Sequence, residues 1–463
     1  MTVVGLTACA VGPDYVRPQT PEGGAWTAPL QGGLVQSPVD SERLAKFWTA
    51  LDDPVLTGLV ERAVSGGSLT VQQAQARVRQ ARALRKVAIG EFFPTVTGNA
   101  QVEREHIVAR TSGIQGTLDL YSATLDASWE IDVFGKLRRN LEAATADRDS
   151  AIWDLRDVLV TLSSEIALAY VDMRSLQERI RIAEATLASQ SETFDLTNWR
   201  AMAGLTTYLD VERARTSVET TRATIPSFRQ ALAADQHSIA VLIGEAPGAV
   251  EDLLRDPKPI PLTPTEVAVG VPADTLSERP DVRAAERSLA AETARIGVVT
   301  ASAYPSLNAL GTIGLEALSP GGLFRAGAWT GALVGTASET IFQGGQIMAN
   351  IEAQNAVRDQ ALAAYQSAVL TALQDVEDAL VAYSQEQDRR KALAAAVTSA
   401  DLALTMAQQQ YGSGLIDFQD VLDAQRSLFV LQDQLASSEG LVTSNLIRLY
   451  KALGGGWVPE AQS

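Results

Sequence analysis

The chain is built from two copies of one plan, and this duplication limits the folds open to it. Residues of one turn sequence recur 210 positions later in a second one. The matched pairs are Gly204 and Gly414, Leu205 and Leu415, Asp210 and Asp420, Val211 and Val421, and Ala214 and Ala424. Other matches, such as Asn140 with Asn350, lie far from the turns. We therefore expect the two halves to occupy equivalent positions in the fold.

Composition excludes several classes of function. With 55 acidic and 38 basic residues the net charge is −17, which disfavours a nucleic-acid partner. One cysteine, Cys9, permits no internal disulfide, and two distant histidines, His106 and His237, do not make a metal cluster. The sequence contains no P-loop, GxGxxG, HExxH or GxSxG arrangement. We predict neither an enzyme nor a bound cofactor or metal.

Any attachment to a membrane would have to use strands or a lipid. No run of eighteen apolar residues is present, so a membrane-spanning helix is not expected. Leu6-Thr7-Ala8-Cys9 has the form of a lipobox, in which the cysteine becomes lipidated, and residues 1–9 are interpreted as the remainder of a signal peptide. The alternative is a lone cysteine near a chain end.

Two very long helical patterns dominate the sequence. Apolar or small residues recur at heptad spacing from residue 137 to residue 194, with one stutter, and residues 346–410 repeat the pattern. At 1.5 Å per residue each rod is about 100 Å long. Both rods turn at a glycine and return, which predicts helical hairpins at 135–243 and 345–453. A second apolar stripe along each helix favours a closed ring of helices over a solid bundle. The seam of the first rod includes Leu137, Leu141, Ala144, Ala151, Leu155, Val158, Leu162, Ile166, Ala169, Met173, Leu176, Ile180, Ala183, Leu187 and Phe194.

Two segments change to a period of two, which is typical of strands. Apolar residues alternate with polar ones from Tyr121 to Val133, and the pattern predicts β-hairpins at about 93–134 and 305–342. Each strand has the length needed to cross a bilayer when tilted, about 9–11 residues. The smallest membrane barrels need about 8 strands, so several chains would have to contribute. An amphipathic sheet on a soluble core is the alternative.

The remaining segments complete the predicted organisation. The ranges are an extended N-terminal strap at 10–40, a first repeat at 41–245, a proline-rich crossover at 246–276, a second repeat at 277–453 and a C-terminal tail at 454–463.

Four motifs in order resemble the TolC-like outer membrane factors, and more narrowly their lipoprotein branch, called NodT-like or OprM-like. The resemblance covers residues 9–457. The motifs are Cys9 with Gly12-Pro13-Asp14-Tyr15-Val16-Arg17-Pro18, Trp129-Glu130-Ile131-Asp132-Val133-Phe134-Gly135-Lys136, Ser277-Glu278-Arg279-Pro280-Asp281-Val282, and Leu422-Asp423-Ala424-Gln425-Arg426-Ser427-Leu428.

The resemblance implies an α+β membrane protein. Its helical hairpins would form an α-barrel through the periplasm, and each chain would give four strands to a 12-stranded transmembrane β-barrel of a homotrimer. Its partners would be a periplasmic adaptor, an inner-membrane resistance-nodulation-division (RND) pump and outer membrane lipid. A covalent lipid on Cys9 would anchor it in the bacterial outer membrane. The implied function is a passive exit duct for drug efflux.

Carried onto this sequence, the resemblance makes the two turns the site of adaptor docking. The docking candidates are Gly204, Leu205, Thr206, Gly414 and Leu415. The family commonly narrows its aperture with a carboxylate just past the second turn, where this chain has Ile416 followed by Asp417.

We therefore consider Asp417, Asp420 and Asp210 as periplasmic gate candidates. The alternative is that these aspartates cap the returning helices, and the two roles are compatible. A duct for type I protein secretion is the rival function, which the lipobox disfavours. A periplasmic adaptor would carry one hairpin instead of two, and a purely structural coiled coil would need no alternating strands.

Overall fold

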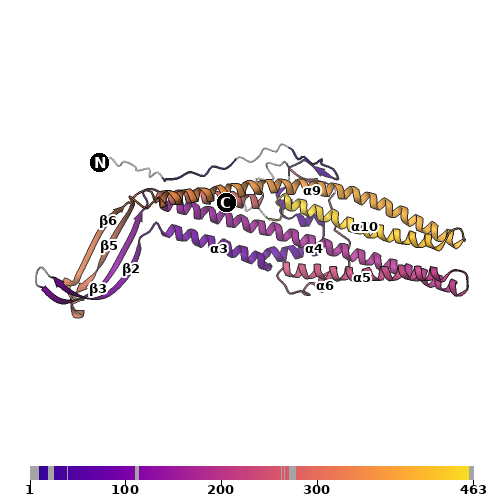
Figure 1. Cartoon of the computed structure of the whole chain (residues 1–463), viewed down its shortest axis with the longest axis horizontal. Coiled ribbons are helices and arrows are strands. Elements are labelled where there is room, and N and C mark those ends of the chain that lie inside the picture. The colour runs from indigo at the N-terminus through magenta and orange to yellow at the C-terminus, as the bar shows by residue number, and fades with distance from the viewer. Residues whose placement is uncertain are drawn as a thin grey trace. The chain divides into compact units, whose positions relative to one another are not determined.

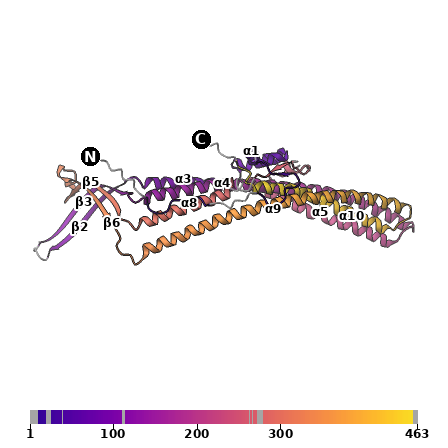
Figure 2. The same cartoon turned by 90° about the horizontal axis from the view of Figure 1, so that it is seen from above.

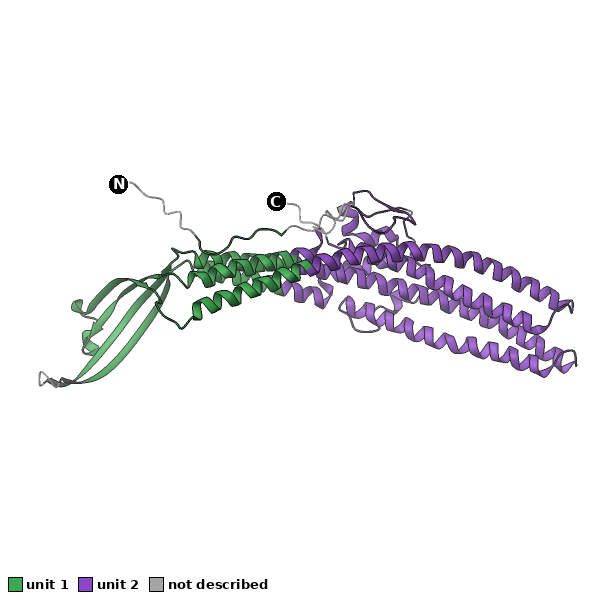
Figure 3. Ribbon diagram, turned by 45° about the horizontal axis from the view of Figure 1, so that its top comes forward, with its two compact units in different colours: residues 1–18, 77–152, 284–366 green, residues 19–76, 153–283, 367–463 purple. Residues whose placement is uncertain are grey.

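A computed structural model of the chain describes residues 10–18, 25–38, 40–109, 114–261, 263–264, 266–270 and 278–457. The chain divides into two compact units (Figure 3). Unit 1 comprises residues 1–18, 77–152 and 284–366, and unit 2 comprises residues 19–76, 153–283 and 367–463.

The two copies contain the same order of long elements (Figure 1). The first has α3 (Leu69–Gly90), β2 (Thr95–Ala109), β3 (Ile114–Ile131), α4 (Lys136–Met202) and α5 (Tyr208–Leu242). The second has α8 (Pro280–Ala301), β5 (Ser306–Ala317), β6 (Trp329–Ser338), α9 (Gln346–Gly412) and α10 (Phe418–Ala452). Helices α4 and α9 both have 67 residues, and α5 and α10 both have 35, so the duplication extends to element length.

Short elements occupy the segments between the long ones. They are β1 (Leu34–Val35), α1 (Ser41–Ala45), η1 (Phe47–Leu51), α2 (Pro54–Arg62), η2 (Ala63–Gly67), α6 (Glu251–Leu254), β4 (Val267–Ala268), η3 (Pro320–Gly322) and η4 (Ala326–Ala328). None of the described helices combines the length and the apolar composition that crossing a bilayer requires.

Unit 1 contains one antiparallel sheet in the order β2, β3, β5, β6, so the hairpins of the two copies pair with each other. Among the described residues, the edge strands β2 and β6 pair on one side only. The second hairpin was predicted to reach residue 342, but β6 ends at Ser338. Its partner Ser306 directly follows Pro305, which has no N–H to continue the ladder.

The sheet has one apolar face that is open to solvent in the single chain. Directly paired residues share a face and successive residues alternate, so the register assigns each side chain to one side. Large exposed members of the apolar face include Val96, Val102, Leu125, Trp129, Ile131, Ile313, Trp329 and Leu333. An exposed apolar surface of this kind indicates that something other than water covers it.

The extended N-terminal segment is fixed to unit 1 by a buried arginine and a close glycine contact. Arg139 donates to the carbonyls of Val11 (3.1 Å) and Gly12 (3.3 Å) and to the carboxylate of Asp14 (2.7 Å). Gly12 has φ +90°, and a Cβ there would lie 2.5 Å from the Cα of Gly297. Only glycine fits this conformation and this approach.

In unit 2, the long helices run as two antiparallel pairs, α4 with α5 and α9 with α10 (Figures 1 and 2). Seam residues Ile166, Met173 and Ala183 of α4 are fully buried, as the heptad pattern predicts. Near the start of α4 the pattern was wrong by one position, because Ala143 and Ala146 are buried and Ala144 is only half-buried.

The core of unit 2 lies where the short elements pack on the long helices. Trp26 and Leu34 of the N-terminal strap are buried in this core, and β1 pairs in parallel with β4 of the crossover. Trp26 also donates its indole N–H to the carbonyl of Gly270 (3.1 Å). The core includes Phe47, Trp48, Leu51, Leu56, Leu59, Tyr170, Ile239, Leu254, Val267, Val376, Leu380, Tyr383, Val442 and Leu446.

A buried polar chain crosses this core. Tyr170 donates its hydroxyl to Asp53 (2.6 Å) and accepts from the buried Arg174 (2.9 Å). Burial, together with the hydrogen bond to Asp53, raises the pKa of Tyr170. Asp53 also caps α2 by accepting from the N–H groups of Val55 and Leu56. The network therefore ties the start of α2 to α4.

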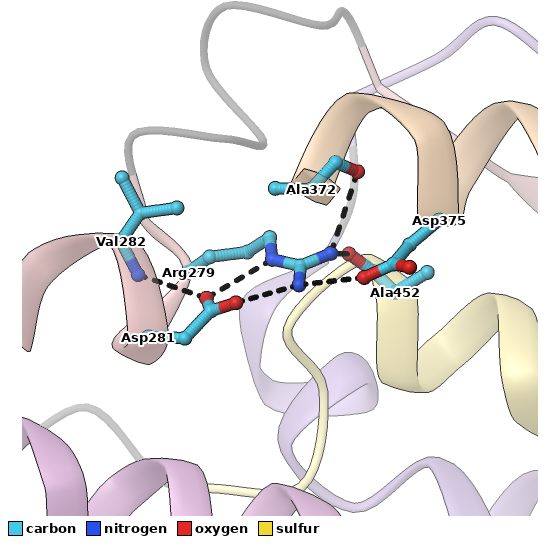
Figure 4. Close-up of polar contacts among 6 residues, drawn as sticks. All are labelled: Arg279, Asp281, Val282, Ala372, Asp375 and Ala452. Atoms are coloured by element: carbon cyan, nitrogen blue, oxygen red, sulfur yellow. Dashed lines mark hydrogen bonds and ion pairs between the residues drawn. The ribbon is translucent and has the colours of Figure 1, made fainter. Parts of the chain in front are cut away.

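Arg279 joins three helices of unit 2 (Figure 4). Its buried guanidinium donates to the carbonyl of Ala452 (2.8 Å) and to the carboxylates of Asp281 (2.7 Å) and Asp375 (3.0 Å). These contacts hold the start of α8 against α9 and the end of α10. The motif that carried part of the family resemblance is thus a structural joint.

Candidate functional site

The two glycine turns have the same backbone structure. Gly204 and Gly414 have φ of 72° and 73°. Each turn has the two hydrogen bonds of a Schellman motif, in which Leu205 N–H bonds to the Arg200 carbonyl (2.8 Å) and Leu415 N–H to the Gln410 carbonyl (2.9 Å). The predicted turns therefore form in both copies, with glycine at the position that needs a positive φ.

The leucine after each glycine is largely exposed to solvent. In a Schellman motif this residue usually packs on the last helical turn, but here the facing positions are Arg200 and Gln410. Leu205 and Leu415 are 70% and 75% exposed. Two large apolar side chains are therefore exposed to water at the turns, which is unfavourable unless another surface covers them.

The first turn carries further exposed apolar residues that the sequence interpretation missed. They are Leu196, Trp199, Met202, Tyr208 and Leu209. Helical periodicity could have identified Trp199 and Met202, because both lie off the buried seam of α4. Thr206, also a docking candidate, donates its hydroxyl to Asp210 (2.9 Å).

The two turns lie side by side in unit 2. Phe418, four residues after Gly414, packs with Ala214 of α5, and Phe194 of α4 lies against the same cluster. Further along the helices, Gln425 donates to Thr193 (3.1 Å). The first and second hairpins therefore pack against each other from the turns onward.

Asp210 is bound within its own turn. Thr207 caps α5 in a capping box with Asp210, whose carboxylate accepts from the Thr207 hydroxyl (2.8 Å), and Arg213 lies 3.6 Å away. Partial burial opposes ionisation, but the hydrogen bonds from Thr207 and Thr206 outweigh it and lower the pKa of Asp210.

Asp417 and Asp420 stand at the equivalent positions of the second turn, but no such box forms. Asp417 is the N-cap residue of α10, and its side chain makes no capping hydrogen bond. The side-chain bond from Thr207 to Asp210 has no counterpart here either, because two ionised carboxylates cannot donate to each other. Both side chains of the second turn are exposed. The duplication is therefore broken at the position of the gate candidates.

Other predicted features bear on the site less directly. Cys9 and its lipobox lie outside the described residues. Within the described part of the chain, no group of three or more His, Cys, Asp or Glu side chains could hold a metal ion.

Comparison with known families gives a match over most of the chain. A family model described as "Outer membrane efflux protein" matches residues 64–245 and 271–455. These ranges correspond to the two copies of the duplication.

Characterised relatives match over nearly their whole length. Nodulation protein T of Rhizobium leguminosarum bv. trifolii is 34% identical over 470 residues, covering 99% of this chain and 97% of the relative. The toluene efflux pump outer membrane protein TtgF of Pseudomonas putida is 30% identical, covering 98% of this chain and 95% of the relative. The solved structure of the outer-membrane channel OprN is 33% identical with a TM-score of 0.92, covering 97% of this chain and 100% of that one.

Proposed function

The chain belongs to the outer membrane efflux protein family, and on that premise we propose that it is the outer membrane channel of a tripartite RND efflux system. It is a passive duct, not an enzyme, through which small molecules cross the periplasm and the outer membrane. The observation that carries the proposal is the four-stranded sheet of unit 1, which exposes a largely apolar face and leaves the outer edges of β2 and β6 without a partner strand within the described residues.

The finer part of the proposal is a homotrimer with a 12-stranded barrel. The strands have 15, 18, 12 and 10 residues, enough to cross a bilayer, which takes about 9–11. Unpaired backbone groups at a sheet edge are costly in lipid, so β2 of one subunit would pair with β6 of the next. Three chains of four strands would close the barrel, whereas one chain falls below the minimum of about 8.

We propose that the turns dock a periplasmic adaptor. The support is the exposure of Leu205 and Leu415 at two turns that lie side by side. Apolar side chains on a rigid helical frame suit the grooves of a helical partner. The frame itself is held by Gly204 and Gly414, and by the bond from Thr206 to Asp210.

We propose that Cys9 carries a covalent lipid that anchors the chain in the outer membrane. The support is the lipobox sequence and the fixed position of the residues that follow it, from Val11 to Asp14, on unit 1. A tether held this way would keep the anchor close to the membrane-spanning unit. We propose no other cofactor.

We propose that Asp417 and Asp420 form the periplasmic gate, whereas Asp210 mainly caps α5. The support is that the first two carboxylates make no capping bond and are exposed, while the third is bound by its own turn. In a homotrimer such residues would form rings of like charge at the aperture.

Deletion of the gene tests the function. We expect the deleted strain to become sensitive to several unrelated drugs, because one exit duct serves a pump of broad specificity. Complementation with the intact gene is the control. A selective loss of one exported protein, with unchanged drug sensitivity, would instead favour a type I secretion duct.

A further inference from the structure

The second face of the sheet, called here the polar face, carries more negative than positive charge. It is formed by the residues that the register places opposite the apolar face. Among its described residues every charged side chain is acidic. These side chains are Glu103, Glu105, Asp126, Glu130 and Glu316. Large apolar exceptions include Leu118, Leu120, Leu310 and Val334.

Asp126 is held at the middle of this face by neutral donors from three strands. Its carboxylate accepts from Asn99 on β2 (2.6 Å), Thr124 on β3 (2.9 Å) and Thr312 on β5 (2.6 Å). Neutral donors orient a carboxylate without cancelling its charge. The result is a fixed negative charge on the polar face.

Most of the other acids on this face have no cation partner. Glu130 is paired with Lys136 (3.0 Å), but no ion pair is formed by Glu103, Glu105 or Glu316 among the described residues. Basic charge on the strands lies on the opposite face, where Arg104 pairs with Asp119. The polar face therefore carries uncompensated negative charge along its length.

We infer that the polar face is a charge filter, which favours cationic over anionic solutes at the outer-membrane segment of the duct. The inference rests on the proposed function, because only a closed barrel turns this face into a pore wall. A passage lined by one sign of charge and surrounded by a low-dielectric wall focuses its field on the solute. Rings of carboxylates select cations for the same reason. The substrate class is therefore cationic and neutral small molecules, with anions disfavoured.

Thiol modification at Ser122 measures this field without requiring an open aperture. Ser122 pairs with Gln101 and Glu316 on the polar face. The full-length Ser122→Cys variant in detergent micelles is treated with a cationic trimethylammonium methanethiosulfonate or an anionic sulfonate methanethiosulfonate. Each modification rate is divided by the rate at which the same reagent reacts with a small thiol in solution. The reaction of the unsubstituted protein is subtracted as the contribution of Cys9.

We expect the cationic reagent to react roughly tenfold faster than the anionic one after this correction. Adding Asp126→Asn and Glu316→Gln should bring the ratio close to one, because the amides keep the size of the acids and remove their negative charge. Adding Asp119→Asn, on the apolar face of the same strand, should leave the ratio unchanged. A ratio near one before neutralisation, or a high ratio that survives it, overturns the charge filter.

The Ala123→Cys variant separates this failure from a failure of the proposed function. Ala123 is adjacent to Ser122 but lies on the apolar face, which detergent covers in a membrane barrel. We expect neither charged reagent to modify this variant. If it reacts as fast as the Ser122→Cys variant, the sheet is not a barrel wall and the proposed function fails, whatever the charge ratio.

Discussion

At the residue scale, burial controls the charge of Asp157 on α4, which lines a cavity of about 390 Å³ with Arg279 and Lys451. Burial, followed by repulsion from Asp281, raises the pKa of Asp157 from 3.8 to about 6. The folded state therefore holds this proton more tightly than the unfolded state. The associated stability is complete below about pH 4 and is lost as pH rises through about 6.

We predict that Asp157→Asn stabilises the protein at pH 7.5 by about 1–3 kcal/mol and flattens its pH dependence between pH 4 and 6. Thermal unfolding in detergent, followed by the helical circular dichroism signal, measures both effects. Asp378→Asn, an exposed carboxylate of the same cavity, is the matched control and should change neither. Equal behaviour of the two variants would contradict the role assigned to Asp157.

At the element scale, the comparison of the two turns separates capping from gating. In the first turn Thr207 and Asp210 form a capping box, while in the second turn Asp417, the N-cap residue of α10, makes no capping hydrogen bond. We predict that replacing both Asp417 and Asp420 with Asn raises the conductance of channels reconstituted in planar bilayers severalfold, because the neutral amides cannot form the charge-assisted hydrogen bonds to donors of neighbouring subunits that the proposed gate requires.

The equivalent change in the first copy is the control. Asp210→Asn should leave conductance unchanged and weaken only the start of α5, at a cost of about 1 kcal/mol. Unchanged conductance in the double variant would reduce Asp417 and Asp420 to helix-capping residues.

Elements with strong local patterns could be predicted from the sequence, while contacts between distant segments could not. Heptad spacing predicts the two long helices, and a glycine predicts each of the turns at Gly204 and Gly414. These elements could therefore be recognised in the sequence. The end of β6 could not be predicted, because the pairing of β6 with β5 determines where the strand ends. The contacts of Arg279 could not be predicted either, because its partners Asp375 and Ala452 are far away in the sequence.

The candidate site shows the same limit. The duplication predicted the positions of its turn residues and carboxylates. It could not predict which side chains are buried. Tyr208 and Phe418 are equivalent residues, yet Tyr208 is 69% exposed and Phe418 is 4% exposed. Packing between the hairpins decides this difference.

At the scale of the whole molecule, that asymmetry leads to a prediction of how the proposed ring of hairpins would close. Phe418 packs with Ala214 of the first hairpin of its own chain. In a closed ring with two equivalent hairpins per subunit, each first hairpin also contacts a second hairpin of a neighbour. The duplication then places the exposed Tyr208 against the counterpart of Ala214, which is Ala424 of the partner subunit.

We predict that the double variant Tyr208→Cys with Ala424→Cys is linked between subunits by a short bifunctional thiol reagent, giving covalent trimers on a denaturing gel. Phe418→Cys with Ala214→Cys is the matched control, because its two positions are in contact within one chain and linkage should leave the mobility of a single chain. The protein with Cys9 alone provides the background. If the control pair is linked but the first pair yields only single chains, the hairpins do not close into the proposed ring, and the barrel that depends on the same threefold symmetry loses its support.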